Sequence, residues 1–141
     1  MTDETVMLSD CFYRTSAKAL ILDEGGRFLL MLEKKGVWEL PGGGLDFGEN
    51  PHECLVREIR EEMGLELVHI AERPTYFLTA PRRDGKGWIA NIIYEVRVKD
   101  LDFVPSDECV EIRFFTAEEA AKENLLPHVT KFVRLYDPTR E

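Results

Sequence analysis

Between Pro41 and Leu65 the chain passes from a glycine-rich turn into a segment with the periodicity of a helix. This segment carries Glu58, Glu61 and Glu62, whose spacing of three and four positions makes them neighbours on a helix surface. Like charges at this spacing destabilise an isolated helix by roughly a few tenths of a kcal/mol. A hard cation would remove that repulsion, and oxygen ligands suit Mg²⁺ or Mn²⁺ better than zinc. The spacing therefore predicts a divalent-metal site on a helix.

The opposite face of the same segment is apolar. Leu55, Val56, Ile59 and Met63 recur at the spacing of a stripe that packs against a core. Such a stripe would anchor the helix on one side and leave the carboxylates accessible on the other.

The sequence also marks where this helix begins and ends. Asn50 is a favoured N-cap, Pro51 fits the first helical position, and Gly64 fits the left-handed C-terminal stop. Glu53 stands three residues after Asn50, the place of the second residue of a capping box. These signals predict a helix over residues 51–63.

The stretch from Gly43 to Leu65 resembles the sequence motif of a known protein family. From Gly43 the sequence reads glycine, five residues, Glu49, seven residues, and then the run REIREEMGL, which ends at Leu65. This pattern resembles the Nudix box at every defining position and is far more specific than a lone glycine motif. The resemblance implies a single Nudix domain over residues 1–141, with the box at residues 43–65. It also implies an α/β fold of the Nudix type, an α/β/α sandwich with a mixed β-sheet between helices.

Strand signals flank the box on both sides. Residues 16–23 and 27–33 read as a hairpin around a glycine-containing turn. A second capping-box pattern, at Thr116 and Glu119, marks the start of another helix. The remaining strands are expected at residues 5–14, 37–40, 65–71, 74–80, 88–98 and 110–115, and the remaining helices at 117–123 and 127–136. This order predicts that the acidic helix and the C-terminal helix cover opposite sides of the sheet.

Composition and charge bound the class of protein. At 141 residues, 44% of them hydrophobic, the chain is long enough for one domain with a proper core. A net charge of −9 argues against binding to nucleic-acid polymers or anionic membranes, because both attract basic surfaces. The N-terminus lacks the basic start and apolar run of a signal peptide, and three widely spaced cysteines indicate reduced thiols. We therefore expect a cytoplasmic protein.

The resemblance implies roles for the residues of the box. Arg57 and Glu49 would hold the carboxylates in place, and Arg57 lies four positions before Glu61, within reach along a helix. The cofactor would be Mg²⁺ or Mn²⁺. The metal ligands would be Gly43, through its carbonyl, and Glu58, Glu61 and Glu62, so that the catalytic set is Arg57, Glu58, Glu61 and Glu62.

The general base is left open between two places in the chain. In some family members it is a glutamate of the box, here Glu58, which we favour. In others it comes from a loop before the last strand, here Glu108 or Glu111. Trp38 could stack on a base of the substrate, although a core or rim aromatic is an equal interpretation. The candidate substrate-binding residues outside the box are Trp38, Glu108 and Glu111.

Proteins with this box typically hydrolyse the pyrophosphate bond of a nucleoside diphosphate linked to another group. The resemblance implies a pyrophosphohydrolase that acts on phosphorus-containing acid anhydrides, with a small nucleotide as substrate. The candidates are a nucleoside triphosphate, ADP-ribose, a nucleotide sugar and a dinucleoside polyphosphate. A homodimer is a further expectation of the resemblance.

Two other classes stay open at this point. Some proteins with this fold are non-catalytic sensing or scaffolding modules, but these generally lose box glutamates, which are intact here. Isomerases of isoprenoid diphosphates also use this fold and a metal, normally in a longer chain.

Overall fold

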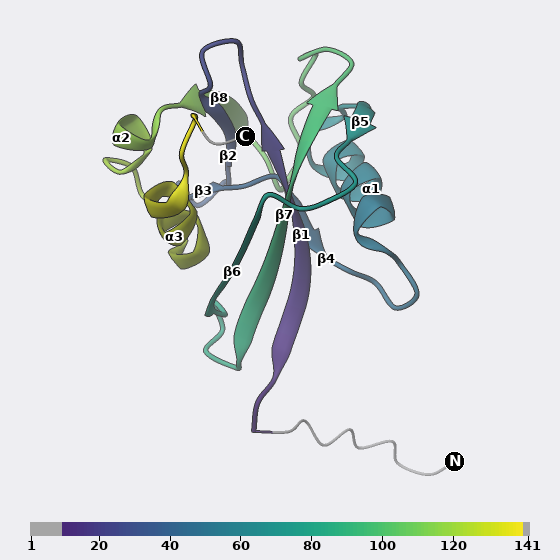
Figure 1. The fold of residues 1–141 in the computed structure, drawn as a ribbon, viewed down its shortest axis with the longest axis vertical. Coiled ribbons are helices and arrows are strands. Elements are labelled where there is room, and N and C mark those ends of the chain that lie inside the picture. Colours follow the sequence, from purple (N-terminus) through teal and green to yellow (C-terminus); the bar gives the residue numbers. More distant parts are fainter. Residues whose placement is uncertain (1–9, 140–141) are drawn as a thin grey trace.

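The computed structural model describes residues 10–139 and folds them into two β-sheets flanked by helices (Figure 1). The larger, five-stranded sheet has the order β4-β1-β7-β5, with β6 also paired to β7, and the smaller, three-stranded sheet has the order β3-β2-β8. The strands are β1 (Tyr13–Ile21), β2 (Phe28–Leu32), β3 (Trp38–Glu39), β4 (Gly42–Gly44), β5 (Leu67–Ile70), β6 (Tyr76–Pro81), β7 (Trp88–Val98) and β8 (Glu111–Phe115). The helices are α1 (Pro51–Met63), α2 (Ala117–Ala120) and α3 (Pro127–Leu135).

The larger sheet is mixed, as the sequence predicted. Its two central strands, β1 and β7, run parallel from the pair Tyr13 and Trp88 to the pair Ile21 and Val96. β4, β5 and β6 pair with them in the antiparallel sense. Among residues 10–139, no helix is both long and apolar enough to cross a membrane.

Helices α1 and α3 cover opposite sides of this sheet (Figure 1). Leu55 and Ile59 of α1 pack in one core cluster with Ala19 of β1, whereas Phe132 of α3 packs in a second cluster with Leu20 of β1. Successive residues of a strand point to opposite faces, so β1 supplies both cores. The predicted sandwich of helix, sheet and helix is confirmed.

The predicted hairpin of residues 16–23 and 27–33 is wrong. β1 and β2 belong to different sheets and meet at a bridge between Leu22 and Phe28, just beside the turn. β1 instead pairs along its whole length with β7, a strand far away in the sequence. The glycine residues correctly predicted the turn after β1. A strand buried on both faces, however, takes its partners from distant parts of the chain, and a local sequence pattern does not show those partners.

The first predicted strand, residues 5–14, is also revised. Residues 5–9 lie outside the described part of the chain, and Tyr13 and Arg14 are the first residues of β1. The long central strand therefore begins before the boundary of residue 16 that the apolar run suggested.

The glycine-rich segment is a short strand rather than the predicted turn. Gly42 and Gly43 of β4 pair with Lys18 and Ala17 of β1. Gly42 has φ +123°, and a Cβ atom there would lie 2.1 Å from the Ala17 carbonyl oxygen. Glycine is therefore required for β4 to approach β1 this closely, and the approach brings β4 beside α1.

Candidate active site

Helix α1 begins and ends at the predicted residues. The Asn50 side chain accepts a hydrogen bond from the Glu53 backbone N–H, and the Glu53 carboxylate accepts one from the Asn50 N–H, each at 2.9 Å. Gly64 closes the helix in the left-handed region, with φ 66°. This capping box fixes the first turn of α1 directly after the loop that follows β4.

The buried face of α1 is rotated slightly from the predicted one. Leu55, Ile59 and Met63 are buried as expected, but Val56 is 38% exposed and Cys54 is fully buried in its place. The prediction for Val56 is wrong because apolar character alone does not show to which side of Leu55 the packing surface extends. Cys54, Glu58 and Glu62 follow one another at a spacing of four residues along α1. The rotation turns this line of side chains towards the sheet.

Three carboxylates gather where α1 meets the loop before β8. Glu58, Glu62 and Glu108 each offer one oxygen atom, and these atoms all lie within 4.8 Å of one another. Three hard oxygen donors at this separation suit Mg²⁺ or Mn²⁺. The donor set of the described residues therefore fits the cation that the sequence predicted.

Glu62 is the buried member of this cluster, with 4% of its surface exposed. Its Oε1 atom accepts a hydrogen bond from the Gly42 backbone N–H at 3.0 Å. Burial raises the pKa of Glu62 to about 8, while the nearby charge of Lys18 opposes that rise. Burial therefore favours the protonated form of Glu62 when no cation is bound, and a cation that binds there displaces the proton.

Glu58 lies against the glycine strand. A Cβ atom on Gly43 would fall 2.6 Å from the carboxyl carbon of Glu58, so a side chain at position 43 would displace that carboxylate. Burial raises the pKa of Glu58, and the hydrogen bond from Arg57 Nη1 to its Oε1, at 3.0 Å, acts in the opposite direction. The Gly43 carbonyl, a predicted ligand, accepts a hydrogen bond from the Cys54 thiol at 3.2 Å.

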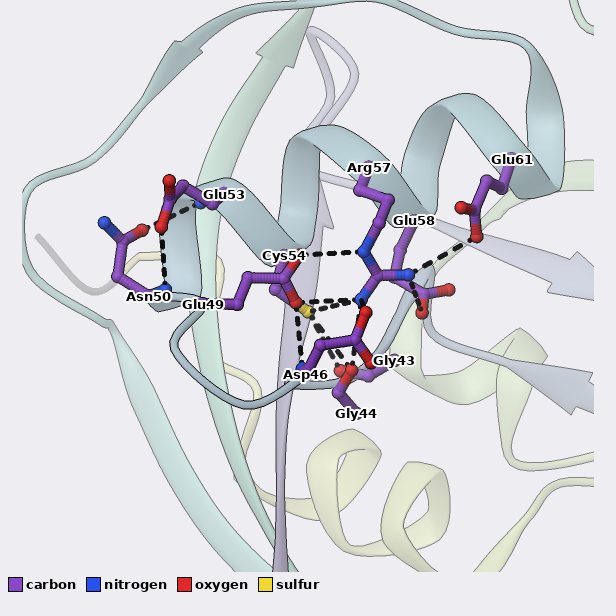
Figure 2. A network of polar contacts seen from close by, with 10 residues as sticks. All are labelled: Gly43, Gly44, Asp46, Glu49, Asn50, Glu53, Cys54, Arg57, Glu58 and Glu61. Atoms are coloured by element: carbon purple, nitrogen blue, oxygen red, sulfur yellow. Dashed lines mark hydrogen bonds and ion pairs between the residues drawn. The ribbon is translucent and has the colours of Figure 1, made fainter.

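Arg57 connects the helix to the loop before it (Figure 2). Its Nε and Nη2 atoms donate to the two oxygens of Glu49 at 2.7 and 2.8 Å, and Nη2 also donates to the Gly44 carbonyl at 3.3 Å. Its Nη1 atom reaches Glu61 at 3.4 Å. These contacts confirm the predicted reach of Arg57 to Glu49 and Glu61, and they hold the guanidinium beside Glu58.

Ser106 holds the third carboxylate near the helix. Its hydroxyl donates to the Glu62 backbone carbonyl at 2.6 Å and accepts from the backbone N–H groups of Glu108 and Cys109, both at 3.2 Å. One hydroxyl therefore joins the last turn of α1 to the loop that carries Glu108.

The other predicted site residues make different contacts. Glu61 is exposed on the outer side of α1. Glu111 pairs with Arg113 at 2.8 Å. Trp38 is 4% exposed and packs edge-on against Phe115, with ring centroids 4.9 Å apart. The structure thus brings together Glu58, Glu62 and Glu108, and the roles of Glu61, Glu111 and Trp38 stay predictions.

Two residues of the site were missed by the sequence analysis. Lys18 lies beside Gly42, and the only signal for it was a charged residue inside the apolar run of β1. Ser106 gave no signal beyond its place in a loop, because the hydrogen bond that connects it to α1 joins segments that are distant in sequence.

Comparisons with known proteins bear on the family and the fold of the chain. The sequence profile of the family described as NUDIX domain matches residues 12–136. Among solved structures, a MutT protein from Methanosarcina mazei Go1 superimposes with a TM-score of 0.77 and 25% sequence identity, over 91% of this chain and 95% of that chain.

Curated relatives match over shorter stretches. An ADP-ribose pyrophosphatase from Methanocaldococcus jannaschii is 30% identical over 106 residues, which are 72% of this chain and 62% of that protein. An RNA pyrophosphohydrolase from Ruthia magnifica subsp. Calyptogena magnifica is 40% identical over 60 residues, 42% of this chain and 34% of that protein. The chain thus spans less than two thirds of the length of either relative.

Proposed function

This chain belongs to the Nudix family, and on that premise we propose that its single Nudix domain is a divalent-metal-dependent pyrophosphohydrolase. Water would attack a pyrophosphate bond in a nucleoside diphosphate that is linked to another group. The observation that carries the proposal is the cluster of Glu58, Glu62 and Glu108, whose oxygen atoms lie within 4.8 Å of one another beside the glycine strand.

The chain's own residues have separable tasks in this proposal. Glu58 and Glu62 bind the cation, joined by Glu61 and the Gly43 carbonyl as the sequence predicted, and Arg57 orients Glu58. A divalent cation held there polarises phosphoryl oxygens and makes water more acidic. The glycine strand lets the Glu58 carboxylate lie directly against its backbone, since a Cβ atom on Gly43 would fall 2.6 Å from the carboxyl carbon of Glu58.

The general base is open between Glu58 and the two glutamates near the last strand, Glu108 and Glu111, of which Glu108 belongs to the cluster and Glu111 pairs with Arg113. Burial raises the pKa of Glu58, which favours proton uptake, but its carboxylate is also held by Arg57. Glu108 is exposed and belongs to the same cluster. The variant Glu108→Gln shows whether Glu108 acts as a metal ligand or as the base. Loss of a ligand weakens Mn²⁺ binding, whereas loss of a base lowers kcat and leaves Mn²⁺ affinity intact.

The substrate is expected among small nucleotides. The name of the relative from Methanocaldococcus jannaschii supports ADP-ribose as a candidate, beside nucleoside triphosphates, nucleotide sugars and dinucleoside polyphosphates. The name of the relative from Ruthia magnifica adds RNA, whose only pyrophosphate bonds lie in a 5′ polyphosphate. The net charge of −9 opposes contact with a long polyanion and leads us to favour the small nucleotides.

The experiment is a phosphate-release screen with Mg²⁺ and with Mn²⁺. The panel holds ADP-ribose, dinucleoside polyphosphates, nucleotide sugars, canonical and oxidised deoxynucleoside triphosphates, NADH and a 5′-triphosphorylated RNA. Glu62→Gln serves as the inactive control, because it keeps the hydrogen bond from Gly42 but removes a charged ligand. We expect metal-dependent turnover of one substrate class by the natural chain and none by the control.

Two results would contradict this proposal. Full activity of a folded Glu62→Gln protein with unchanged metal dependence would exclude the assigned site. Tight Mg²⁺ binding without turnover of any member of the panel would favour a sensing or scaffolding module. The expectations of a cytoplasmic location and a homodimer belong to the same proposal, and sedimentation of the purified chain tests the second.

A further inference from the structure

A buried lysine stands next to the candidate metal site. Lys18 of β1 is 5% exposed, and its Nζ atom donates to the Gly42 carbonyl at 3.2 Å. The same atom lies 3.5 Å from Glu39 Oε2, with both side chains more than nine-tenths buried. A charged group is costly to bury unless it is paired and hydrogen-bonded, and these two partners offset that cost for Lys18.

The ion pair extends to the C-terminal helix. Glu39 contacts His128 Nε2 through Oε1, and that oxygen also accepts from the Leu40 backbone N–H at 2.7 Å. His128 belongs to α3 and is 3% exposed. A continuous series of polar contacts therefore runs from α3 through Glu39 and Lys18 to the glycine strand.

The series continues to a carboxylate of the metal cluster. The Pro41 carbonyl accepts from the Ala19 N–H at 2.8 Å, and the N–H of the same peptide, on Gly42, donates to Glu62 Oε1 at 3.0 Å. Lys18 holds the next carbonyl, that of Gly42. The peptide before Gly42 is thus held by β1, and the carbonyl after it is held by Lys18 in addition to the pairing of Gly43 with Ala17.

We propose that Lys18 is a positioning residue for the metal site: it holds the Gly42 carbonyl and so fixes the backbone angle at Gly42 between that carbonyl and the N–H that donates to the Glu62 carboxylate. The inference rests on the proposed function, because it assigns Lys18 to the metal ligand Glu62. Outer residues that orient metal ligands commonly change metal affinity by about tenfold or more when replaced.

The competing explanation is that Lys18 only balances Glu39 and so stabilises the fold. Removal of Lys18 by itself would not distinguish the two, because it leaves Glu39 buried without its cation. The double variant Lys18→Met/Glu39→Gln removes both charges, and the amide that replaces the carboxylate of Glu39 can still hydrogen-bond to His128. Glu39→Gln is the matched control: it removes the anion beside Lys18 but leaves an amide oxygen and the Gly42 carbonyl as acceptors for Nζ, so Lys18 stays at Gly42.

The experiment measures Mn²⁺ binding to the full chain by electron paramagnetic resonance, with circular dichroism and thermal unfolding as tests of folding. We expect the natural chain and Glu39→Gln to bind Mn²⁺ within about threefold of each other, because Lys18 stays in place in both. We expect the folded double variant to bind at least about tenfold more weakly than Glu39→Gln. Equal affinity in the double variant and its control would overturn the role of Lys18.

Two safeguards keep the result decisive. If the double variant does not fold, Lys18→Leu/Glu39→Gln takes its place, with a side chain at position 18 that is uncharged and cannot donate to the Gly42 carbonyl. For that variant we expect at least about fivefold weaker binding, and equal binding would again refute the inference. Failure of the natural chain to bind Mn²⁺ would instead overturn the proposed function, and the role of Lys18 with it.

Discussion

Arg57 and Glu49 form a two-point ion pair across the start of α1. The Nε atom of Arg57 lies 2.7 Å from Oε2 of Glu49, and its Nη2 atom lies 2.8 Å from Oε1 (Figure 2). The planar guanidinium is thereby fixed in orientation, and its remaining Nη1 atom faces Glu58 at 3.0 Å. The loop before α1 is thus connected through one side chain to a proposed ligand.

Replacement of Arg57 by lysine should therefore weaken the metal site. Lysine keeps the positive charge but cannot contact both oxygens of Glu49 and Glu58 at once. We expect Mn²⁺ affinity and metal-dependent turnover to fall by about tenfold, with the fold retained. Arg60→Lys on the exposed side of α1 is the matched control and should change neither quantity. Equal loss in both variants would show that the effect is not specific to Arg57.

The ion pair between Arg57 and Glu49 should contribute to the stability of the protein against acid. Hydrogen bonds from Arg57 lower the pKa of Glu49 from 4.5 to about 2. The folded state therefore binds this proton more weakly than the unfolded state, and the stabilisation is present above pH 4.5 and lost as the pH falls towards 2. Urea unfolding of the natural chain and of Glu49→Gln, measured across this range, should give free energies that converge as the pH falls. A difference that stays constant down to pH 2 would contradict the assignment.

A methyl group on Gly43 should disrupt the site at a different point. The Cβ atom of Gly43→Ala would lie 2.6 Å from the carboxyl carbon of Glu58, so the carboxylate must move. We expect at least about a tenfold loss of metal-dependent turnover with little change in thermal stability. Gly25→Ala, where the nearest atom is 3.6 Å away, is the control for a glycine replacement and should keep full activity. Normal turnover of Gly43→Ala would mean that Glu58 is not needed in its present position.

The helix of the site could be predicted because its signals are local. The capping box of Asn50 and Glu53, the stop at Gly64 and the contacts of Arg57 all lie within one stretch of chain. Spacing also located Glu58 and Glu62 on one side of α1. It did not show that Glu62 would be buried, because the burial of a residue depends on the strand packed against it, here β4.

The remaining parts of the site depend on contacts between distant segments. Lys18 reaches Gly42 because β1 and β4 are paired, and β1 was expected to pair with β2 instead. Glu108 was named from the resemblance as one of the candidates for the base, and its position beside Glu62 follows from the fold of a loop without regular structure. Such contacts have no periodicity in the sequence from which they could be inferred.

Ser106 provides the test of how that loop is held. Its hydroxyl donates to the Glu62 carbonyl at 2.6 Å and accepts from the Glu108 N–H at 3.2 Å, so Ser106→Ala should leave Glu108 less well placed beside the other carboxylates. We expect turnover at saturating Mg²⁺ to fall by about tenfold, measured as kcat. Ser106→Thr keeps the hydroxyl and should restore most of the activity.

A loss of stability alone must be separated from this effect on the site. Thr116→Ala removes the cap of α2, where Thr116 Oγ1 accepts from the Glu119 N–H at 3.1 Å, and should cost about 1 kcal/mol of folding free energy. Because α2 contributes no carboxylate to the cluster, that variant should keep its kcat although it unfolds at a lower temperature. If Thr116→Ala and Ser106→Ala lose activity in the same proportion to their loss of stability, the hydroxyl of Ser106 only stabilises the fold. If activity falls in Ser106→Ala alone, the loop position of Glu108 is part of the catalytic geometry.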